Sequence, residues 1–146
     1  IKYRWFAESS GKTFYATRSL PHQKKIKMHR QITNAPADLV VDHIDHNGLN
    51  NCRSNLRLCT RAQNIRNAPL RNSGTSKYKG VSWFASSKKW VAAIRSNNKR
   101  HHIGYFDDEV TAGKAYDEKA KELHGEFACL NFPPTVIPTE AEGSAK

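Results

Sequence analysis

The stretch that decides the fold is Val40-Val41-Asp42-His43-Ile44-Asp45, followed by Asn55-Leu56-Arg57-Leu58-Cys59-Thr60 and by Gln63-Asn64-Ile65-Arg66-Asn67. The first run predicts a strand, Asn47-Gly48 predicts a tight turn, and Leu56 to Thr60 predicts a returning strand. Thr60 is expected to cap a short helix, because Gln63 follows it with the spacing of a capping box. Residues 38–72 are therefore predicted to form a strand, strand, helix unit.

Four polar residues of this unit have the chemistry needed to hydrolyse a phosphodiester. Asp42 and His43 end the first strand and Asn64 lies one turn into the helix, so these three side chains can converge on one ion. His43 suits a general base, because an imidazole with a pKa near ~6.5 is partly neutral at physiological pH. Asp42 and Asn64 offer oxygen ligands that Mg²⁺ or Mn²⁺ accepts. Asn55 is expected to accept the other ring proton of His43 and so to orient the ring.

This stretch resembles the HNH nuclease motif of phage homing endonucleases, which the spacing of Asp42-His43, Asn55 and Asn64 matches. The resemblance implies catalytic roles for His43 and Asn55, with one divalent cation held by Asp42 and Asn64. Many HNH enzymes have His where Asn64 stands. The Asn also occurs in the homing subgroup, and it favours a softly held cation over tightly bound zinc.

The loop between the two strands contains further polar residues, namely Asp45, His46, Asn50 and Asn51. We expect them to stabilise turns of the loop, and assistance by Asp45 or His46 to the metal or to DNA is the alternative. For the whole motif, an asparagine-rich loop that satisfies its own backbone, or a decayed nuclease, also stays open. His29-Arg30 precede the unit, with either a structural role or phosphate binding.

Residues 73–132 show a second pattern, which predicts three short strands covered by one helix. The strands are expected at Gly80 to Phe84, Lys89 to Arg95 and Arg100 to Phe106, joined by polar loops. Period-two alternation assigns to the core face Val81, Trp83, Trp90, Ala92, Ile94, Ile103 and Tyr105. It assigns to the open face Ser82, Phe84, Lys89, Val91, Ala93, Arg95, Arg100 and His102.

A helix is expected to cover the core face, because a sheet of this size is not stable alone. Asp107 or Asp108 can cap its start, and Gly125 lies where it would end. The stripe that packs on the sheet is predicted to be Ala112, Ala115, Tyr116, Ala120 and Leu123. The acidic residues expected to point away from the core are Asp117, Glu118, Glu122 and Glu126.

This module resembles the AP2 domain of plant-type transcription factors and phage endonucleases, through Tyr78-Lys79-Gly80-Val81, residues 90–95 and 103–107, Ala115-Tyr116-Asp117 and residues 130–133. The resemblance implies that the sheet lies in the major groove of double-stranded DNA. The positions it assigns to DNA contact are Lys79, Ser82, Phe84, Lys89, Arg95, Arg100 and His102. Arg95 and Arg100 suit guanine, Phe84 suits a thymine methyl group, and Lys79 and Lys89 suit phosphates. Ser82, Phe84, Ala93 and His102 depart from the plant pattern, so the plant target sequence is not expected to carry over.

The charge of the chain supports a nucleic-acid partner. The 146 residues include 24 Lys and Arg against 13 Asp and Glu, a net charge of +11. Residues 73–106 hold seven basic and no acidic residues, whereas residues 107–132 hold three basic and seven acidic ones. This contrast favours a polarised module with one face for phosphates. An effect on solubility alone is the alternative.

The remaining segments complete the predicted α+β architecture. Residues 1–37, with eight basic residues and one acidic residue, are expected to form short strands that offer cations to a DNA backbone. Residues 67–77 are expected to be a linker, and residues 133–146 a flexible tail. The three cysteines, Cys52, Cys59 and Cys129, are expected to be buried free thiols. The longest apolar run is far too short to span a membrane and no secretory signal is visible, so we expect an intracellular, cytoplasmic protein.

These patterns together predict a metal-dependent DNA endonuclease in which the HNH unit cuts and the AP2-like sheet helps to select the site. A non-catalytic DNA-binding regulator with a decayed HNH motif is the alternative, and an RNA-binding protein is a weaker third. No protein partner is implied, and the oligomeric state stays open.

Overall fold

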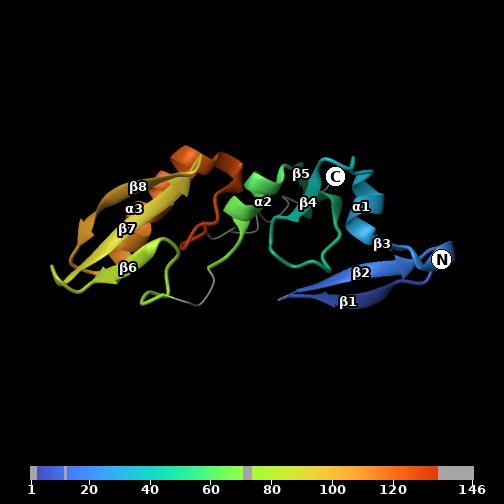
Figure 1. Cartoon of the computed structure of the whole chain (residues 1–146), viewed down its shortest axis with the longest axis horizontal. Coiled ribbons are helices and arrows are strands. Elements are labelled where there is room, and N and C mark those ends of the chain that lie inside the picture. Colours follow the sequence, from blue (N-terminus) through green and yellow to red (C-terminus); the bar gives the residue numbers. More distant parts are fainter. Residues whose placement is uncertain (1–2, 12, 71–73, 135–146) are drawn as a thin grey trace, which may run out of the picture.

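The computed structural model describes residues 3–11, 13–70 and 74–134, and these residues form three antiparallel sheets with a small number of helices (Figure 1). The sheets follow one another along the longest axis of the molecule in the order of the sequence. The predicted mixture of helices and antiparallel strands is confirmed. No helix in these described ranges is both long enough and apolar enough to cross a membrane.

The first sheet is formed by the basic amino-terminal segment. Its strands are β1 (Phe6–Ser10), β2 (Thr13–Ser19) and β3 (Lys25–Lys27), with β2 in the centre. A 3-10 turn, η1 (Pro21–Gln23), leads into β3, and helix α1 (Met28–Thr33) follows directly. The helix contacts β2, β4 and β5, so the sheet is joined to the unit that follows it.

The second unit has the predicted strand, strand, helix order. Strand β4 (Val40–His43) pairs with β5 (Leu56–Cys59), so that Val40 lies opposite Cys59 and His43 opposite Leu56. Helix α2 (Arg61–Asn67) begins at Thr60, and the expected capping box with Gln63 is confirmed, since each side chain bonds to the backbone of the other residue.

The connection between β4 and β5 differs from the predicted tight turn at Asn47-Gly48. It is the loop of residues 44–55, which ends in a 3-10 turn, η2 (Arg53–Asn55). Short polar side chains shape the loop: Asp45 Oδ1 accepts from the backbone N–H of Asn47, and Asn47 Oδ1 accepts from that of Leu49. These side-chain hydrogen bonds take the place of the backbone bonds that a hairpin would form between its strands. The pairing of β4 with β5 therefore ends at His43 and Leu56.

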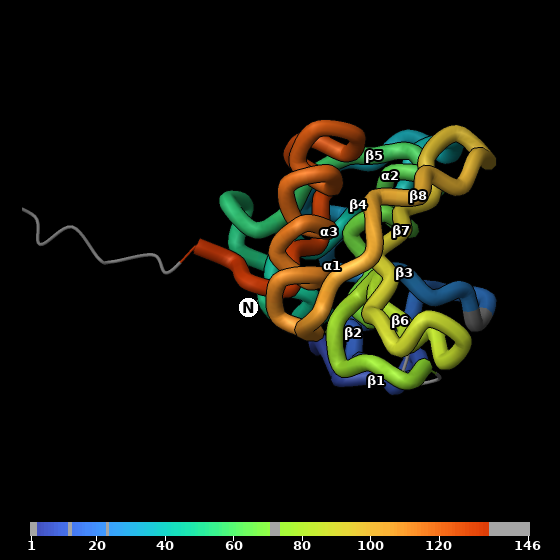
Figure 2. The backbone as a smooth tube through the Cα atoms, turned by 90° about the vertical axis from the view of Figure 1, so that its left-hand side faces the viewer, coloured from blue at the N-terminus to red at the C-terminus, as the bar shows by residue number. Residues whose placement is uncertain are grey.

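The third unit is a sheet of β6 (Val81–Phe84), β7 (Lys89–Ser96) and β8 (Lys99–Phe106), with α3 (Glu109–His124) on one face (Figures 1 and 2). The three predicted strands and the helix are confirmed. Asp108 caps α3 by accepting from the backbone N–H of Thr111, and Gly125 ends it at a φ of 54°. A short turn, η3 (Gly125–Phe127), follows. The core between sheet and helix contains Val81, Ala92, Ile94, Ala112, Tyr116 and Ala120.

Two aromatic residues assigned to this core from their alternation are largely exposed. The pairing of β7 with β8 shifts register between Ala92 and Ala93, so that Ala92 lies opposite Gly104 and Ala93 opposite His102. Ile103 is the extra residue, and the shift turns Tyr105 to the same face as His102. Tyr105 is 55% exposed, so its predicted core position is wrong. Trp83 is also exposed, at the edge of the sheet, where its ring packs edge-on against Trp90.

Burial also corrects the assignments of Asp117 and of two cysteines. Asp117 does not point to solvent: it is 4% exposed, and its carboxylate accepts from the backbone N–H groups of Asn131 and Phe132 at 2.8 Å. It therefore fixes the chain that returns along α3. Among the cysteines, all free, Cys59 is buried as expected, whereas Cys52 is exposed and Cys129 is half-buried.

Contacts between side chains and backbone join the second unit to the third. Arg57, on β5, donates to the carbonyl of Glu126 and stacks on the ring of Phe127. Lys79 donates to the carbonyls of Arg66 and Ala68, at the carboxyl end of α2. The second and third units are thus held together directly as well as through the chain.

Candidate active site

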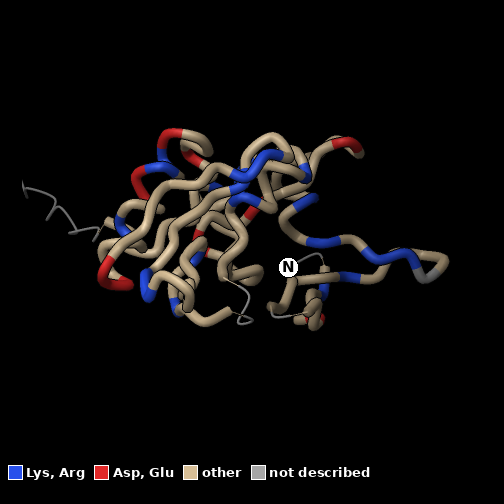
Figure 3. The backbone as a smooth tube through the Cα atoms, turned by 60° about the vertical axis from the view of Figure 1, so that its left-hand side comes forward, with Lys and Arg blue, Asp and Glu red and all other residues tan. Residues whose placement is uncertain are grey.

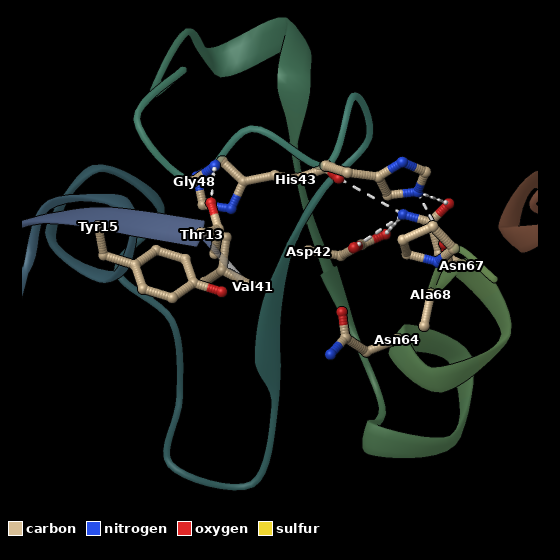
Figure 4. A pocket seen from close by; sticks show the side chains of 11 residues that line it. Thr13, Tyr15, Val41, Asp42, His43, Gly48, Asn64, Asn67 and Ala68 are labelled. Carbon is tan, nitrogen blue, oxygen red and sulfur yellow. Dashed lines mark hydrogen bonds between the residues drawn. The ribbon is translucent and has the colours of Figure 1, made fainter. Parts of the chain in front are cut away.

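A cavity of about 290 Å³ lies where the first sheet meets the second unit (Figure 4). Strand β2 contributes Tyr15, β4 contributes Asp42 and His43, and α2 contributes Asn64 and Asn67. The structure therefore brings three of the four predicted site residues, Asp42, His43 and Asn64, to one cavity. These residues line the same cavity because the antiparallel β4–β5 pair returns the chain to α2 beside the end of β4. From neighbouring positions of β4, the ring of His43 points toward Tyr15 and the carboxylate of Asp42 points toward Asn67 (Figure 4).

Asp42 is held in place from two sides. It is 5% exposed, and its Oδ2 accepts from Nε of Arg57 at 2.8 Å. Asn67 Nδ2 donates to both carboxylate oxygens at 2.9 Å (Figure 4). Oδ1 thus has Asn67 as its partner and retains capacity for a further contact. The result is a fixed carboxylate with one oxygen able to take a cation.

Asn64 supplies the second oxygen donor of the cavity. Its side chain is half-buried near the start of α2, and its side-chain amide forms no hydrogen bond with any residue of the described ranges, whereas its backbone N–H donates to the carbonyl of Thr60. One carboxylate and one amide oxygen are donors that hard divalent cations accept, with water and phosphate in the remaining positions. In the described part of the chain, no three His, Cys, Asp or Glu side chains are grouped so that they could hold a metal ion.

His43 is 6% exposed, and its Nε2 has no hydrogen-bond partner among the described residues. Burial lowers the pKa of His43, an effect opposed by the side chain of Asn51 and by the carboxylates of Asp45 and Asp42. The net pKa stays below its ordinary value. The imidazole is therefore unprotonated at neutral pH, which is the form a general base requires.

The expectation that Asn55 orients the ring of His43 is wrong. The Asn55 amide donates to Asp45 Oδ1 and to the carbonyl of Asn50, and its oxygen accepts from the backbone N–H of Asp45. Asn55 therefore closes the 44–55 loop. Asn51 is the loop amide whose side chain opposes the effect of burial on the pKa of His43. Only the folded loop distinguishes it, because several asparagines of the loop share the same chemistry.

Sequence reasoning missed the aromatic surroundings of His43. The ring of His29, from α1, lies 5.0 Å from that of His43, and the ring of Tyr15 lies 5.2 Å from His29 and 5.8 Å from His43. These residues are distant from the motif in sequence, although His29-Arg30 gave a partial signal. Arg30 has a structural role, since its guanidinium donates to the carbonyls of Ala35, Pro36 and Leu39.

The open face of the third sheet presents most of the residues predicted to contact DNA. Its exposed side chains are Ser82, Phe84, Arg95, Arg100 and His102, with Tyr105 added by the register shift. Tyr105 joins an aromatic group, with ring centres 4.9 Å from His102 and 5.9 Å from Phe84. Acidic positions gather along α3, on the opposite face, as Figure 3 shows. The open face is therefore polar, basic and partly aromatic.

Two lysines predicted to contact phosphates are engaged elsewhere. Lys79 is half-buried and its ammonium donates to carbonyls of Arg66 and Ala68, at 2.8 and 2.6 Å. Burial lowers the pKa of Lys79. It serves as a cap for α2 in place of the predicted phosphate contact. Lys89 forms an ion pair with Asp107, at the margin of the sheet.

Comparison with known proteins gives the family. An HNH endonuclease family model matches residues 34–66. An uncharacterized HNH endonuclease of Acanthamoeba polyphaga mimivirus is 38% identical over 136 residues, which cover 89% of this chain and 67% of the relative. The chain belongs to the HNH endonuclease family. Protein 3.8 of Escherichia phage T7 is 34% identical to this HNH family member over 93 residues, covering 64% of this chain and 76% of the relative.

The HNH family member also has an AP2-like domain. Dehydration-responsive element-binding protein 2A of Arabidopsis thaliana is 49% identical over 47 residues, which cover 31% of this chain and 14% of the relative. No solved structure gives a significant match. The stretch of this chain that the family model matches includes Asp42, His43, Asn55 and Asn64, but it begins after Tyr15 and His29. The walls of the cavity thus extend beyond the matched motif.

Proposed function

We propose that this HNH family member is a metal-dependent, site-recognising endonuclease that hydrolyses phosphodiester bonds of double-stranded DNA, as a nick or a double-strand break. The observation that carries the proposal is the meeting of Asp42, His43 and Asn64 at one cavity. Family membership supports the same reaction class. The resemblance to phage homing endonucleases favours cleavage at selected sites.

His43 acts as the base in this proposal, and its Nε2, which has no hydrogen-bond partner in the described part of the chain, takes a proton from the attacking water. Its lowered pKa keeps the imidazole ready for this step at neutral pH. Asp42 and Asn64 would hold one divalent cation, Mg²⁺ or Mn²⁺. When bound, the cation offsets negative charge on the phosphate and on the leaving oxygen. Arg57 and Asn67 keep Asp42 in position for that role.

The open face of the third sheet is proposed to read the DNA major groove. Arg95 and Arg100 are exposed there and suit bidentate contacts to guanine, while Phe84 suits a thymine methyl group. Ser82 and His102 lie on the same face. The net charge of +11 supplies the general attraction to the duplex. Lys79, which caps α2, is left out of this assignment.

Cleavage of supercoiled plasmid in Mg²⁺ or Mn²⁺ tests the proposal. We expect the wild-type protein to nick or linearise the plasmid, and chelation of the cation to stop it. His43→Ala should abolish cleavage while gel-shift binding of DNA survives. The control His22→Asn removes an imidazole outside the cavity and suits the left-handed backbone there, with φ of 62°. Cleavage by His43→Ala at the wild-type rate would reject the assigned base.

The rival function is a non-catalytic DNA-binding regulator with a decayed HNH motif. It is favoured by the short match to a plant element-binding protein. The same plasmid experiment decides between the two functions, because a regulator leaves the plasmid supercoiled in either metal while still retarding it in a gel.

A further inference from the structure

A lysine of the first sheet stands beside the wall of the cavity. In the pairing of β2 with β3, Lys27 lies opposite Thr17, which places it on the face of the sheet that also carries Tyr15. Its Nζ lies 4.1 Å from the centre of the Tyr15 ring. Tyr15 in turn lines the cavity with Asp42 and His43. One aromatic ring thus separates the ammonium of Lys27 from the site of the proposed chemistry.

The ring that supports Lys27 is fixed. It packs against His29 and His43, with ring centres 5.2 and 5.8 Å away. On another side it meets Gly48 of the 44–55 loop, where an added Cβ would lie 2.7 Å from the Tyr15 ring and 2.5 Å from the carbonyl of Phe14. Such close packing restricts movement of the ring on which the ammonium of Lys27 rests.

Lys27 is half-buried, and none of the described acidic side chains forms an ion pair with it. Lys25, two residues earlier on the same strand and face, differs: it is exposed and pairs with Glu8. After burial itself, the charge of Lys27 is among the causes that lower the pKa values of His29 and His43. The charge of Lys27 therefore acts on the cavity, while the carboxylate of Glu8, whose pKa Lys27 also lowers, is paired with Lys25.

Resting on the proposed function, we infer that Lys27, held on the ring of Tyr15, binds a phosphate of the cleaved DNA strand at or next to the scissile bond. An ammonium offers three donors and a full positive charge, which suits a phosphate oxygen. The first sheet then belongs to the active site as well as to the DNA-binding surface. The contact positions the strand against His43 and transfers no proton.

Lys27→Met and Lys25→Met form a matched pair for the test, because both remove one charge from the same strand and face. In single-turnover cleavage of linear duplex, Lys27→Met should slow the reaction about tenfold or more, whereas Lys25→Met should stay within about twofold of wild type. Lys27→Arg should recover most of the rate. Equal rates for the two Met variants would overturn the inference.

Neutral methylphosphonates, placed singly along the cleaved strand, add a readout that a purely structural lysine would not move. At one phosphate the substitution should slow the wild-type protein but cause no further loss in Lys27→Met. Equal losses in both proteins at every phosphate would overturn the inference, even if Lys27→Met folds poorly. The proposed function fails separately, if His43→Ala cleaves as fast as wild type or the wild type does not cleave.

Discussion

Arg57 holds the carboxylate of Asp42 with Nε and Nη2, both at 2.8 Å, while Nη1 of the same guanidinium donates to the backbone carbonyl of Glu126 after α3. One side chain therefore joins the proposed metal ligand to the unit that carries the proposed DNA-reading sheet. A guanidinium has several N–H donors fixed in one plane, so it can bind the carboxylate of Asp42 and the carbonyl of Glu126 at the same time, whereas a lysine has no such fixed set of donors.

Removing the Arg57 guanidinium should leave a buried, poorly compensated carboxylate. For Arg57→Met we expect the free energy of unfolding to fall by roughly 3–5 kcal/mol, as when one partner of a buried ion pair is removed. The double variant Arg57→Met, Asp42→Asn should recover part of the loss, because the uncompensated charge is gone. Urea denaturation of the wild type, the two single variants and the double variant gives the coupling energy between Arg57 and Asp42. Strictly additive losses in unfolding free energy would contradict the expected coupling.

Asn55 and Asn51 should respond differently to alanine. Asn55→Ala leaves polar groups of Asp45 and Asn50 without partners, so we expect a loss of about 1–3 kcal/mol in unfolding free energy. Asn51→Ala should change stability less and the cleavage rate more, since this side chain opposes the effect of burial on the pKa of His43. Thermal melts and cleavage rates of both variants check the contrast. If Asn55→Ala instead slowed cleavage more than Asn51→Ala, Asn55 would be the residue that orients the ring of His43.

The stability of the protein should fall with acid because of His29. Burial lowers the pKa of His29 to about 4, from an ordinary value of 6.5. Between these values the unfolded chain binds the proton that the folded protein excludes. The unfolding free energy should therefore decrease as pH falls from 6.5 toward 4, by up to about 1.4 kcal/mol per pH unit from this group. His29→Phe keeps a ring and should flatten that dependence in urea titrations, whereas parallel curves would exclude His29 as its source.

Arg95 should affect which DNA site is chosen. It is exposed on the open face of the third sheet, and loss of a bidentate base contact costs about 1–3 kcal/mol of discrimination. Arg95→Ala should weaken binding to a preferred site and relax its selection from a randomised duplex pool. Lys114→Ala, which removes one exposed charge from α3 on the opposite side of the sheet, is the control. Unchanged affinity and unchanged selection in Arg95→Ala would show that the sheet face is misassigned.

The local elements of this fold were predictable because their signals are local. The capping box at Thr60, the cap at Asp108 and the glycine at 125 each act within a few residues, and the structure has all three. The same reading brought Asp42, His43 and Asn64 to one region of the fold, and the structure has them line one cavity, whereas their convergence on one ion stays a prediction. Contacts between distant segments were not predictable: nothing near Tyr15 in the sequence indicates that its ring lies against His43.

The register shift in β8 was missed for a different reason. Strict alternation is the only rule that sequence offers for sorting a strand, and one extra residue at Ile103 reverses it for every position beyond. Tyr105 therefore lies outside, while Phe106 packs against the core. Asp117 shows the same limit on a helix, because its partners, the backbone N–H groups of Asn131 and Phe132, come from a chain segment without regular structure.

The contacts of Lys79 with the end of α2, and of Arg66 with Asn97 at 3.2 Å, bear on target geometry. They fasten the helix that carries Asn64 to the sheet that carries Arg95, independently of the chain that links them. If the sheet reads bases and the cavity cuts, the number of base pairs between the bases read and the bond broken is fixed by the protein. Cleavage would then occur at a constant number of base pairs from the bases that are read, whatever sequence lies between.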